Sequence, residues 1–270
     1  MKFQKVALTI SQQVAQLESR GMFFEDKAKA SHYLTNISYY RLSAYWYTFL
    51  ENPKSNHLFN QGTSFQQVID TYVFDRKLRL LIFDEIERLE ISLRTNLIYH
   101  FCHEFGSNWY EDKNLFRKYE FYQKFNKLMD EEKLRTSEVF IRHYKSKYHD
   151  PINPPAWMVL ELASFGQLST LYKNLGSCDA KKKVAEHFKL DDIVLSSWLE
   201  TLSYVRNTCA HHSRLWNRKI PKPPILPTNA GDEWLTEIPD ETKKNRLYLV
   251  LSLIAYLLKT IVPDSRFCLK

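Results

Sequence analysis

Glycine is scarce in this sequence, with 6 residues among 270, whereas aromatic residues make up 14%. A many-stranded sandwich or barrel needs frequent tight turns, so this composition favours long packed helices instead. The apolar fraction of 44% and the charged fraction of 26% are ordinary for a folded soluble protein. We therefore predict an all-α fold, built as one large domain or two small ones.

Paired cysteines and long apolar runs are also lacking. The four cysteines (Cys102, Cys178, Cys209 and Cys268) form no Cys-x-x-Cys pair, which leaves a zinc ribbon, a thioredoxin-type site and a disulfide framework without support. No stretch approaches 18 uninterrupted apolar residues, so we expect no membrane span. The run from Val6 to Ile10 is too short for a signal-peptide core. We expect a reducing, cytoplasmic location.

The charge is biased to one sign, because the formal net charge is +7 and the isoelectric point is about 9.0. Such a surplus fits a polyanionic partner, either nucleic acid or an acidic membrane surface. Glycine-rich phosphate loops and Gly-x-Ser-x-Gly elbows are absent, so nucleotide hydrolysis and α/β-hydrolase chemistry have no support.

Helical periodicity covers most of the chain. We expect helices over residues 4–20, 25–36, 65–101, 118–147 (one helix or a pair with a basic surface), 157–172, 193–212 and 245–261. Mixed charges opposite the apolar stripe of 65–101 predict a solvated face, and the cluster Lys181 to Lys183 predicts another. Residues 1–62 are interpreted as an N-terminal helical and aromatic extension packed on a core domain of residues 63–270.

The segment from 38 to 49, SYYRLSAYWYTF, is crowded with aromatic residues. One interpretation is a platform on which bases stack, with Arg41 adding cation–π contacts. The other, which we favour, is a packed aromatic cluster between helices, because aromatic side chains usually bury their large area in cores.

The segment from 199 to 218, LETLSYVRNTCAHHSRLWNR, holds the residues best suited to chemistry. On a helix Leu202, Val205 and Cys209 share an inward stripe. Arg206 precedes His211 by five positions, so the two side chains diverge by about 140° on an ideal helix. They converge only if the helix ends near Ala210, or if a second copy of the chain supplies the other half of the site.

These residue types suit phosphodiester cleavage in RNA, whose 2′-hydroxyl is itself the nucleophile. An imidazole can exchange protons near neutral pH, and a guanidinium can stabilise the charged phosphate. Asn207 would hold a histidine tautomer or contact the backbone, and no metal is required. An Arg-x4-His spacing is common, however. A structural polar cluster at a helix end is the main alternative, and zinc bound by Cys209, His211 and His212 lacks further ligands at a recognised spacing.

The chain resembles the Abi-like abortive-infection proteins of bacteria, of the AbiD/AbiF type. Four segments carry the resemblance, in the family's order and within residues 30 to 220: SYYRLSAYWYTF, FDRKLRLLIFDEIERLEISLR, PPAWMVLELASFGQLSTLY and VRNTCAHHSRLWNR. The family often has glycine where this chain has Ala44.

The resemblance implies membership in the HEPN superfamily, whose signature is an arginine, a polar residue and a histidine four to six positions on. It assigns Arg206, Asn207 and His211 as catalytic, and His212 also satisfies the spacing as an accessory candidate. A further accessory candidate is Glu161, which lies in an otherwise apolar helix start and would either pair with an arginine or complement the N-terminal helix dipole. It implies a helical bundle, a homodimer with both motifs in one cleft, and metal-independent cleavage of RNA without a cofactor, in phage defence. Cationic candidates for binding RNA are Arg41, Arg88, Arg94, Arg214, Arg218 and Lys219.

Two alternatives follow, because not every HEPN domain cleaves RNA. The first is a non-catalytic defence protein that docks a structured noncoding RNA. The second is a structural or toxin-neutralising protein that binds another protein.

Overall fold

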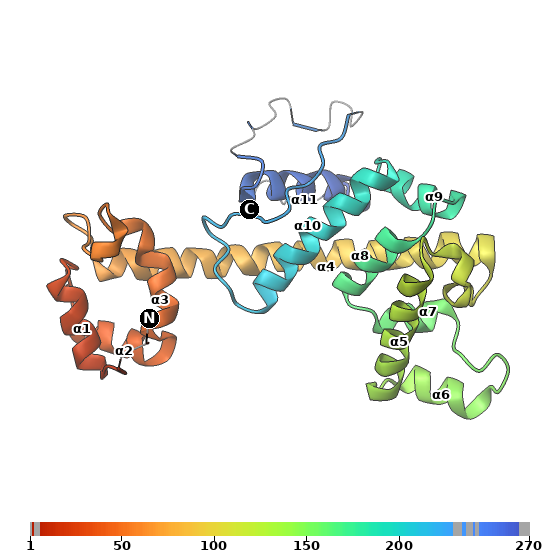
Figure 1. The fold of residues 1–270 in the computed structure, drawn as a ribbon, viewed down its shortest axis with the longest axis horizontal. Helices are drawn as coiled ribbons and strands as arrows, with labels where there is room; N and C mark the ends of the chain where they lie inside the picture. Colours follow the sequence, from red (N-terminus) through yellow and green to blue (C-terminus); the bar gives the residue numbers. More distant parts are fainter. Residues whose placement is uncertain (1, 3–5, 229–233, 236–239, 241–242, 265–270) are drawn as a thin grey trace. The chain divides into compact units, whose positions relative to one another are not determined.

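A computed structural model describes residues 2, 6–228, 234–235, 240 and 243–264, and Cys268 lies outside them. Over this part of the chain the fold is all-α, as predicted, and no sheet is present (Figure 1). The helices are α1 (Ile10–Ser19), α2 (Lys27–Ile37), α3 (Tyr39–Trp46), α4 (Phe65–Phe105), α5 (Tyr119–Arg135), α6 (Val139–Lys147), α7 (Ala156–Val159), α8 (Phe165–Asn174), α9 (Asp179–His187), α10 (Asp192–Ala210) and α11 (Leu247–Ile261). Among the described residues, no helix has both the length and the apolar character that crossing a membrane requires.

The chain divides into two compact units. The N-terminal unit comprises residues 1–80 together with 212–216, and the main unit comprises residues 81–211 and 217–270. Helix α4 therefore contributes residues 65–80 to the first unit and 81–105 to the second. The short segment 212–216, directly after α10, belongs to the N-terminal unit although it lies far along the sequence.

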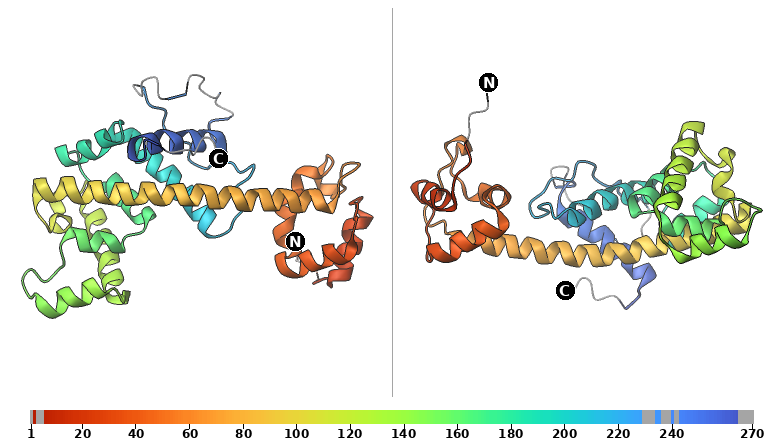
Figure 2. Two further views of the ribbon diagram at one scale, coloured as in Figure 1. Left: turned by 180° about the vertical axis from the view of Figure 1, so that it is seen from behind. Right: turned by 90° about the horizontal axis from the view of Figure 1, so that it is seen from below.

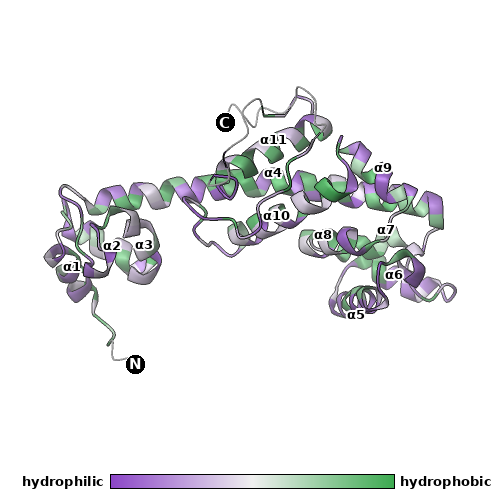
Figure 3. Cartoon of the chain, turned by 45° about the horizontal axis from the view of Figure 1, so that its top comes forward, coloured by the Kyte–Doolittle hydropathy of each residue, from purple (hydrophilic) through white to green (hydrophobic). Residues whose placement is uncertain are grey.

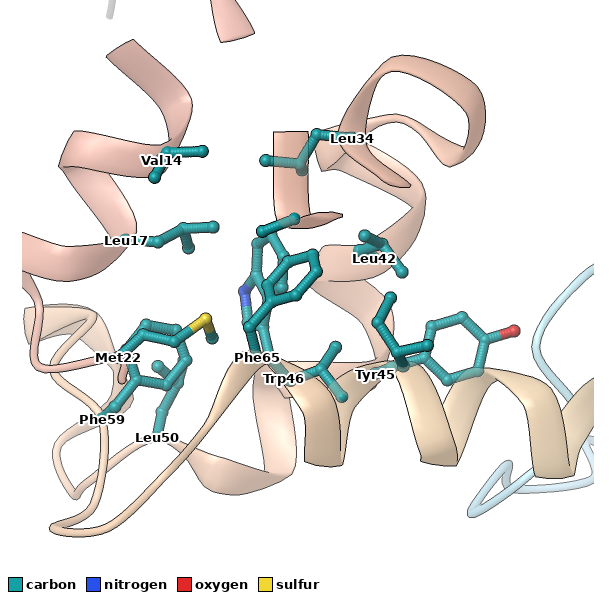
Figure 4. Packing of buried hydrophobic residues seen from close by; sticks show 13 residues of the cluster. Val14, Leu17, Met22, Leu34, Leu42, Tyr45, Trp46, Leu50, Phe59 and Phe65 are labelled. Carbon is teal, nitrogen blue, oxygen red and sulfur yellow. The ribbon is translucent and has the colours of Figure 1, made fainter. Parts of the chain in front are cut away.

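The N-terminal unit is built around an apolar core between α1, α2, α3 and the start of α4 (Figure 4). Leu17 and Leu42 are fully buried there, and Trp46 is 5% exposed. The aromatic segment 38–49 thus supplies core residues, as the favoured interpretation predicted, although Tyr40 remains 89% exposed. Gly21, with φ of 94°, takes the left-handed conformation that ends α1.

A buried carboxylate, Asp75, organises the polar interior of the N-terminal unit. Its Oδ2 accepts hydrogen bonds from the hydroxyl of Tyr45 (2.7 Å) and from the guanidinium of Arg79. Its Oδ1 accepts from the backbone amides of Leu215 (3.0 Å) and Trp216 (2.6 Å). Burial, and then the hydrogen bond to Asp75, raise the pKa of Tyr45 to about 12. The side chain of Asp75 therefore joins α4 to segment 212–216, although Asp75 and Leu215 are 140 residues apart in the sequence.

The prediction that the charged face of α4 is solvated is wrong for two of its residues. Arg79 is 6% exposed in the N-terminal unit, and Glu85 is 1% exposed in the main unit. Each faces a partner of opposite sign on the same helix, since Asp75 binds Arg79 and Arg88 lies 3.5 Å from Glu85. Pairing within one helix permits these charges to be buried.

In the main unit, α10 contacts α8, α9 and α11 (Figure 2). The predicted inward stripe of Leu202, Val205 and Cys209 is buried. Helix α11 is apolar over most of its length (Figure 3), and the ring of its Tyr256 packs edge-on against Trp198 of α10 at 5.5 Å. This packing holds α10, and with it the polar residues at its end.

The expected helix over 157–172 is interrupted. α7 ends at Val159, and a 3-10 turn follows at Leu160–Leu162 before α8 begins. Ser164 caps α8, since its backbone amide donates to the side chain of Gln167 at 2.6 Å in a capping box. Local capping at Ser164 therefore starts a new helix within a continuous apolar pattern.

The prediction that Lys181 faces solvent is also wrong, because its side chain is 1% exposed. Its ammonium group donates to the carbonyl oxygen of Leu175 at 2.9 Å and lies 5.0 Å from the ring centre of Tyr172. Burial lowers the pKa of Lys181 to about 8. The folded protein therefore holds the positive charge of Lys181 beside the C-terminal end of α8 at a cost in desolvation free energy.

Lys181→Met is expected to raise the free energy of unfolding at pH 7 by about 1 kcal/mol, because relief of the ammonium group's desolvation cost outweighs the loss of its hydrogen bond to the Leu175 carbonyl and of its ion pair with Asp192 at 3.9 Å. The penalty is complete below pH 8, where Lys181 is protonated in both states. It fades towards the unfolded-state pKa of about 10.4, because the folded protein releases the proton first. Urea unfolding should show that Lys181→Met raises the free energy of unfolding by less at pH 9.5 than at pH 7. The exposed neighbour Lys182→Met serves as control, and equal effects of both variants would refute the prediction.

Candidate functional site

The site begins with the end of α10 (Figure 1). The helix starts at its N-cap Asp191, whose carboxylate accepts from the amides of Ile193 and Val194. It ends at Ala210, and His211 is the C-cap residue, with φ of −84° and ψ of 11°. The helix thus ends at Ala210, one of the two conditions stated for Arg206 and His211, while the amide of His211 still donates to the carbonyl oxygen of Asn207 at 3.0 Å, as in a helix.

The polar residues of this segment lie on its open side. Asn207 and His211 are exposed and Arg206 is half-buried, all in the main unit. The buried residues Val205 and Cys209 anchor the opposite side of the same turns. The motif thus presents a cation, an amide and an imidazole to solvent from a fixed helix end.

The guanidinium of Arg206 is oriented by an aromatic ring that the sequence did not single out. Its Cζ lies 5.5 Å from the ring centre of Phe83 on α4, and its Nη1 lies 3.4 Å from Oδ1 of Asn207. A cation above an aromatic face is attracted by the ring's quadrupole. Phe83 belongs to the predicted helix 65–101, but no spacing in the sequence links it to a residue 123 positions further on.

A hollow of about 520 Å³ opens beside Arg206 in the main unit. Three carboxylates, two guanidiniums, one aromatic ring and one aliphatic side chain line it: Phe83, Glu87, Glu90, Ile91, Arg94, Glu161 and Arg206. Glu161, predicted as an accessory residue, therefore lies with Arg206 at one hollow. Its carboxylate is 3.7 Å from Arg94, so it pairs with an arginine, one of the two roles considered for it.

Arg94 is held by structural contacts. Its Nε donates to the carbonyl oxygen of Leu160 at 3.0 Å, and its Nη2 donates to that of Ala163 at 3.0 Å and to Glu90 at 2.9 Å. Its side chain is only 12% exposed. The residue proposed from sequence as an RNA contact thus ties α4 to the turn between α7 and α8.

Arg94→Ala is expected to lower the free energy of unfolding by about 2–3 kcal/mol, because two carbonyl groups and the Glu90 carboxylate lose a charged donor. Chemical denaturation would measure the change. Arg142→Ala, an exposed arginine on α6, is the matched control and should stay within about 0.5 kcal/mol of the wild type. Similar midpoints for the two variants would contradict the assignment.

The remaining cationic candidates differ in their surroundings. In the main unit Arg218 donates to the hydroxyl of Tyr204 at 2.7 Å, the side chain of Arg88 is 44% exposed, and Lys219 is exposed. In the N-terminal unit Arg41 donates to the carbonyl oxygen of His212 at 2.6 Å, and Arg214 donates to that of Ala44 at 2.6 Å. Arg41 and Arg214 therefore stabilise the fold of segment 212–216.

His212 belongs to the N-terminal unit and has a left-handed backbone, with φ of 55°. Its side chain is exposed, and its carbonyl group is bound by Arg41. Over the described residues, no group of three or more His, Cys, Asp or Glu side chains is arranged to hold a metal ion.

Comparison with known proteins adds one result. No curated protein and no solved structure matches the chain. The family model described as Abi-like protein matches residues 32–217, which include α10 and the segment that follows it as far as Asn217. Because this match spans more than half of the sequence and contains Arg206, Asn207 and His211, the chain belongs to the Abi-like protein family.

Proposed function

We propose that this Abi-like protein acts in abortive infection, a form of phage defence, as a metal-independent endoribonuclease of the HEPN type. Arg206, Asn207 and His211 are its proposed catalytic residues. The observation that carries the proposal is the end of α10 at Ala210, which leaves the exposed imidazole of His211 just beyond the turn that holds Arg206 and Asn207.

The proposed reaction uses the nucleophile that RNA provides. The 2′-hydroxyl oxygen bonds to phosphorus while its proton passes to a base, and the bond from phosphorus to the 5′-oxygen breaks as an acid protonates that oxygen. Arg206 stabilises the negative charge of the phosphorane. The products are a 2′,3′-cyclic phosphate and a 5′-hydroxyl. Because His211 supplies one imidazole per copy, a homodimer would provide both the base and the acid.

The test is cleavage of end-labelled RNA by purified protein in EDTA, with the product ends identified by mass spectrometry. We expect cyclic phosphate ends, and loss of cleavage in Arg206→Ala and His211→Ala. Arg142→Ala and His143→Ala, an exposed pair on α6, are matched controls and should cleave normally. Absence of cleavage by the wild type, or equal cleavage by all variants, would refute the proposal.

A second candidate function is binding of a structured RNA without cleavage, and the α5–α6 surface favours it. Exposed cationic side chains lie there: Lys124, Lys127, Lys145 and Lys147. This function predicts RNA binding that weakens steeply with salt, persists in Arg206→Ala and His211→Ala, and fails when those four residues are replaced by glutamate. Cleavage by the wild type would instead select the nuclease.

A further inference from the structure

The hollow beside Arg206 is unsuited to a phosphate. Glu90 and Arg94 form a pair at 2.9 Å with side chains only 15% and 12% exposed, so their charges offset each other. Of the remaining lining charges, Glu87 and Glu161 are negative and Arg206 alone is positive. Glu87 is exposed and takes part in no ion pair among the described residues. The interior of the hollow therefore repels anions and accepts hydrogen bonds, whereas Arg206 can bind an anion at its edge.

The apolar lining and the volume suit a planar group. Phe83 and Ile91 line the hollow, and about 520 Å³ lies within the usual range for small-ligand pockets. Aromatic side chains in RNA-binding proteins hold unstacked bases in this way. If Arg206 binds the reacting phosphate, the nearest planar group of the substrate is a base on an adjoining nucleotide.

The carboxylates decide which base fits. An ionised carboxylate only accepts hydrogen bonds, so it favours a base edge that donates. On its pairing edge guanine carries two adjacent donors, N1–H and the N2 amino group. Cytosine and adenine carry one donor beside an acceptor, and uracil carries one donor between two carbonyl groups.

We propose that this hollow is a nucleobase subsite that prefers guanine, with the Glu87 carboxylate accepting from N1–H and the N2 amino group. The inference rests on the proposed function, because it places Arg206 at the phosphate of the same substrate. Glu161, paired with Arg94 at 3.7 Å, lines the same hollow, and its aromatic lining is Phe83, whose ring also lies 5.5 Å from the Arg206 guanidinium.

The experiment uses short RNAs that differ in one base at each position in turn. The wild type should cleave RNA with guanine at one fixed position about 10–100-fold faster than RNA with uracil there, the range expected for a bidentate base contact. Inosine lacks the N2 amino group, so replacing guanine by inosine should slow cleavage about tenfold in the wild type. In Glu87→Gln the preference for guanine over inosine should fall below about twofold. Glu120→Gln, an exposed glutamate on α5, should keep it.

Binding of the same RNAs by His211→Ala, measured by fluorescence anisotropy, separates this inference from the proposed function. Cleavage by the wild type without base preference, or with a preference that survives Glu87→Gln, overturns the subsite and leaves the nuclease standing. If no RNA is cleaved, the nuclease proposal fails, and a guanine preference in binding that depends on Glu87 still supports the subsite. Equal binding of RNAs with all four bases overturns the subsite. A Glu87→Gln variant that changes only the oligomeric state also overturns it, because a basic side chain of a second copy would then occupy the hollow.

Discussion

His211→Ala is expected to slow RNA cleavage by about a hundredfold to ten-thousandfold, the range that a positioned general acid or base contributes. The residue caps α10 and its imidazole is exposed, so its removal should leave the packing of the helix unchanged. Single-turnover cleavage of a labelled RNA would measure the rate, and circular dichroism would check that the helix content is retained.

The neighbouring histidine provides the sharpest control. His212 has a φ of 55°, so alanine there would introduce backbone strain, whereas asparagine tolerates this conformation. His212→Asn should therefore keep the backbone that Arg41 binds while removing the imidazole. We expect near-normal cleavage. A loss as large as that of His211→Ala would move the acid–base role to His212.

Arg206 should behave as a group that stabilises charge. Arg206→Ala is expected to lower the rate by about a hundredfold to a thousandfold, the range measured when one donor to a developing anion is removed. Arg206→Lys keeps the charge but loses the planar guanidinium and its stacking on Phe83. Its cleavage rate should therefore lie between those of Arg206→Ala and the wild type. Equal rates for the lysine variant and the wild type would indicate that Arg206 acts only through its charge.

Subunit mixing tests whether the site is shared. If both imidazoles of a homodimer serve one reaction, a dimer of one wild-type and one His211→Ala chain should be inactive. Activity should then fall as the square of the wild-type fraction after exchange is complete. A linear decrease would show that each chain carries a whole site.

The sequence predicted the features that depend on local pattern. The buried stripe of Leu202, Val205 and Cys209 on α10 follows from the helical period of 3.6 residues. The position of His211 outside the helix was a condition that the sequence could state but not decide. A helix end shifts by one or two residues with little change in the pattern that encodes it.

The features that the sequence missed depend on distant contacts. A mixed-sign face can be solvated or internally paired, and the buried Arg79 shows the second outcome only because Asp75 and Tyr45 surround it. Lys181 is buried because a carbonyl group and an aromatic ring, six and nine residues earlier, receive its ammonium group. Phe83 meets Arg206 from another helix. Apart from the spacing of four between Asp75 and Arg79, none of these pairings leaves a periodic signal in the chain.

Asp75→Ala is expected to lower the free energy of unfolding by about 3–5 kcal/mol, the largest stability effect that we predict. The carboxylate is fully buried and accepts from Tyr45, Arg79 and the amides of Leu215 and Trp216. Alanine would leave the Arg79 charge buried without its partner and would strip the amides of their acceptor. Removing one member of a buried charged pair costs more than the pair contributes, because the other charge stays desolvated.

Asp70→Ala is the matched control, since Asp70 is an exposed aspartate on the same helix and in the same unit, and it should change stability by no more than about 0.5 kcal/mol. Asp75→Asn keeps the shape but loses the charge, so its loss should be smaller than that of alanine. Urea denaturation would give the energies, and hydrogen exchange at Leu215 and Trp216 would report the local effect. Those two amides should exchange faster in Asp75→Ala than in Asp70→Ala, because their acceptor is Oδ1 of Asp75 itself. Unchanged exchange at both amides would mean that segment 212–216 is held by Arg41 and Arg214 alone, through the carbonyl groups of His212 and Ala44.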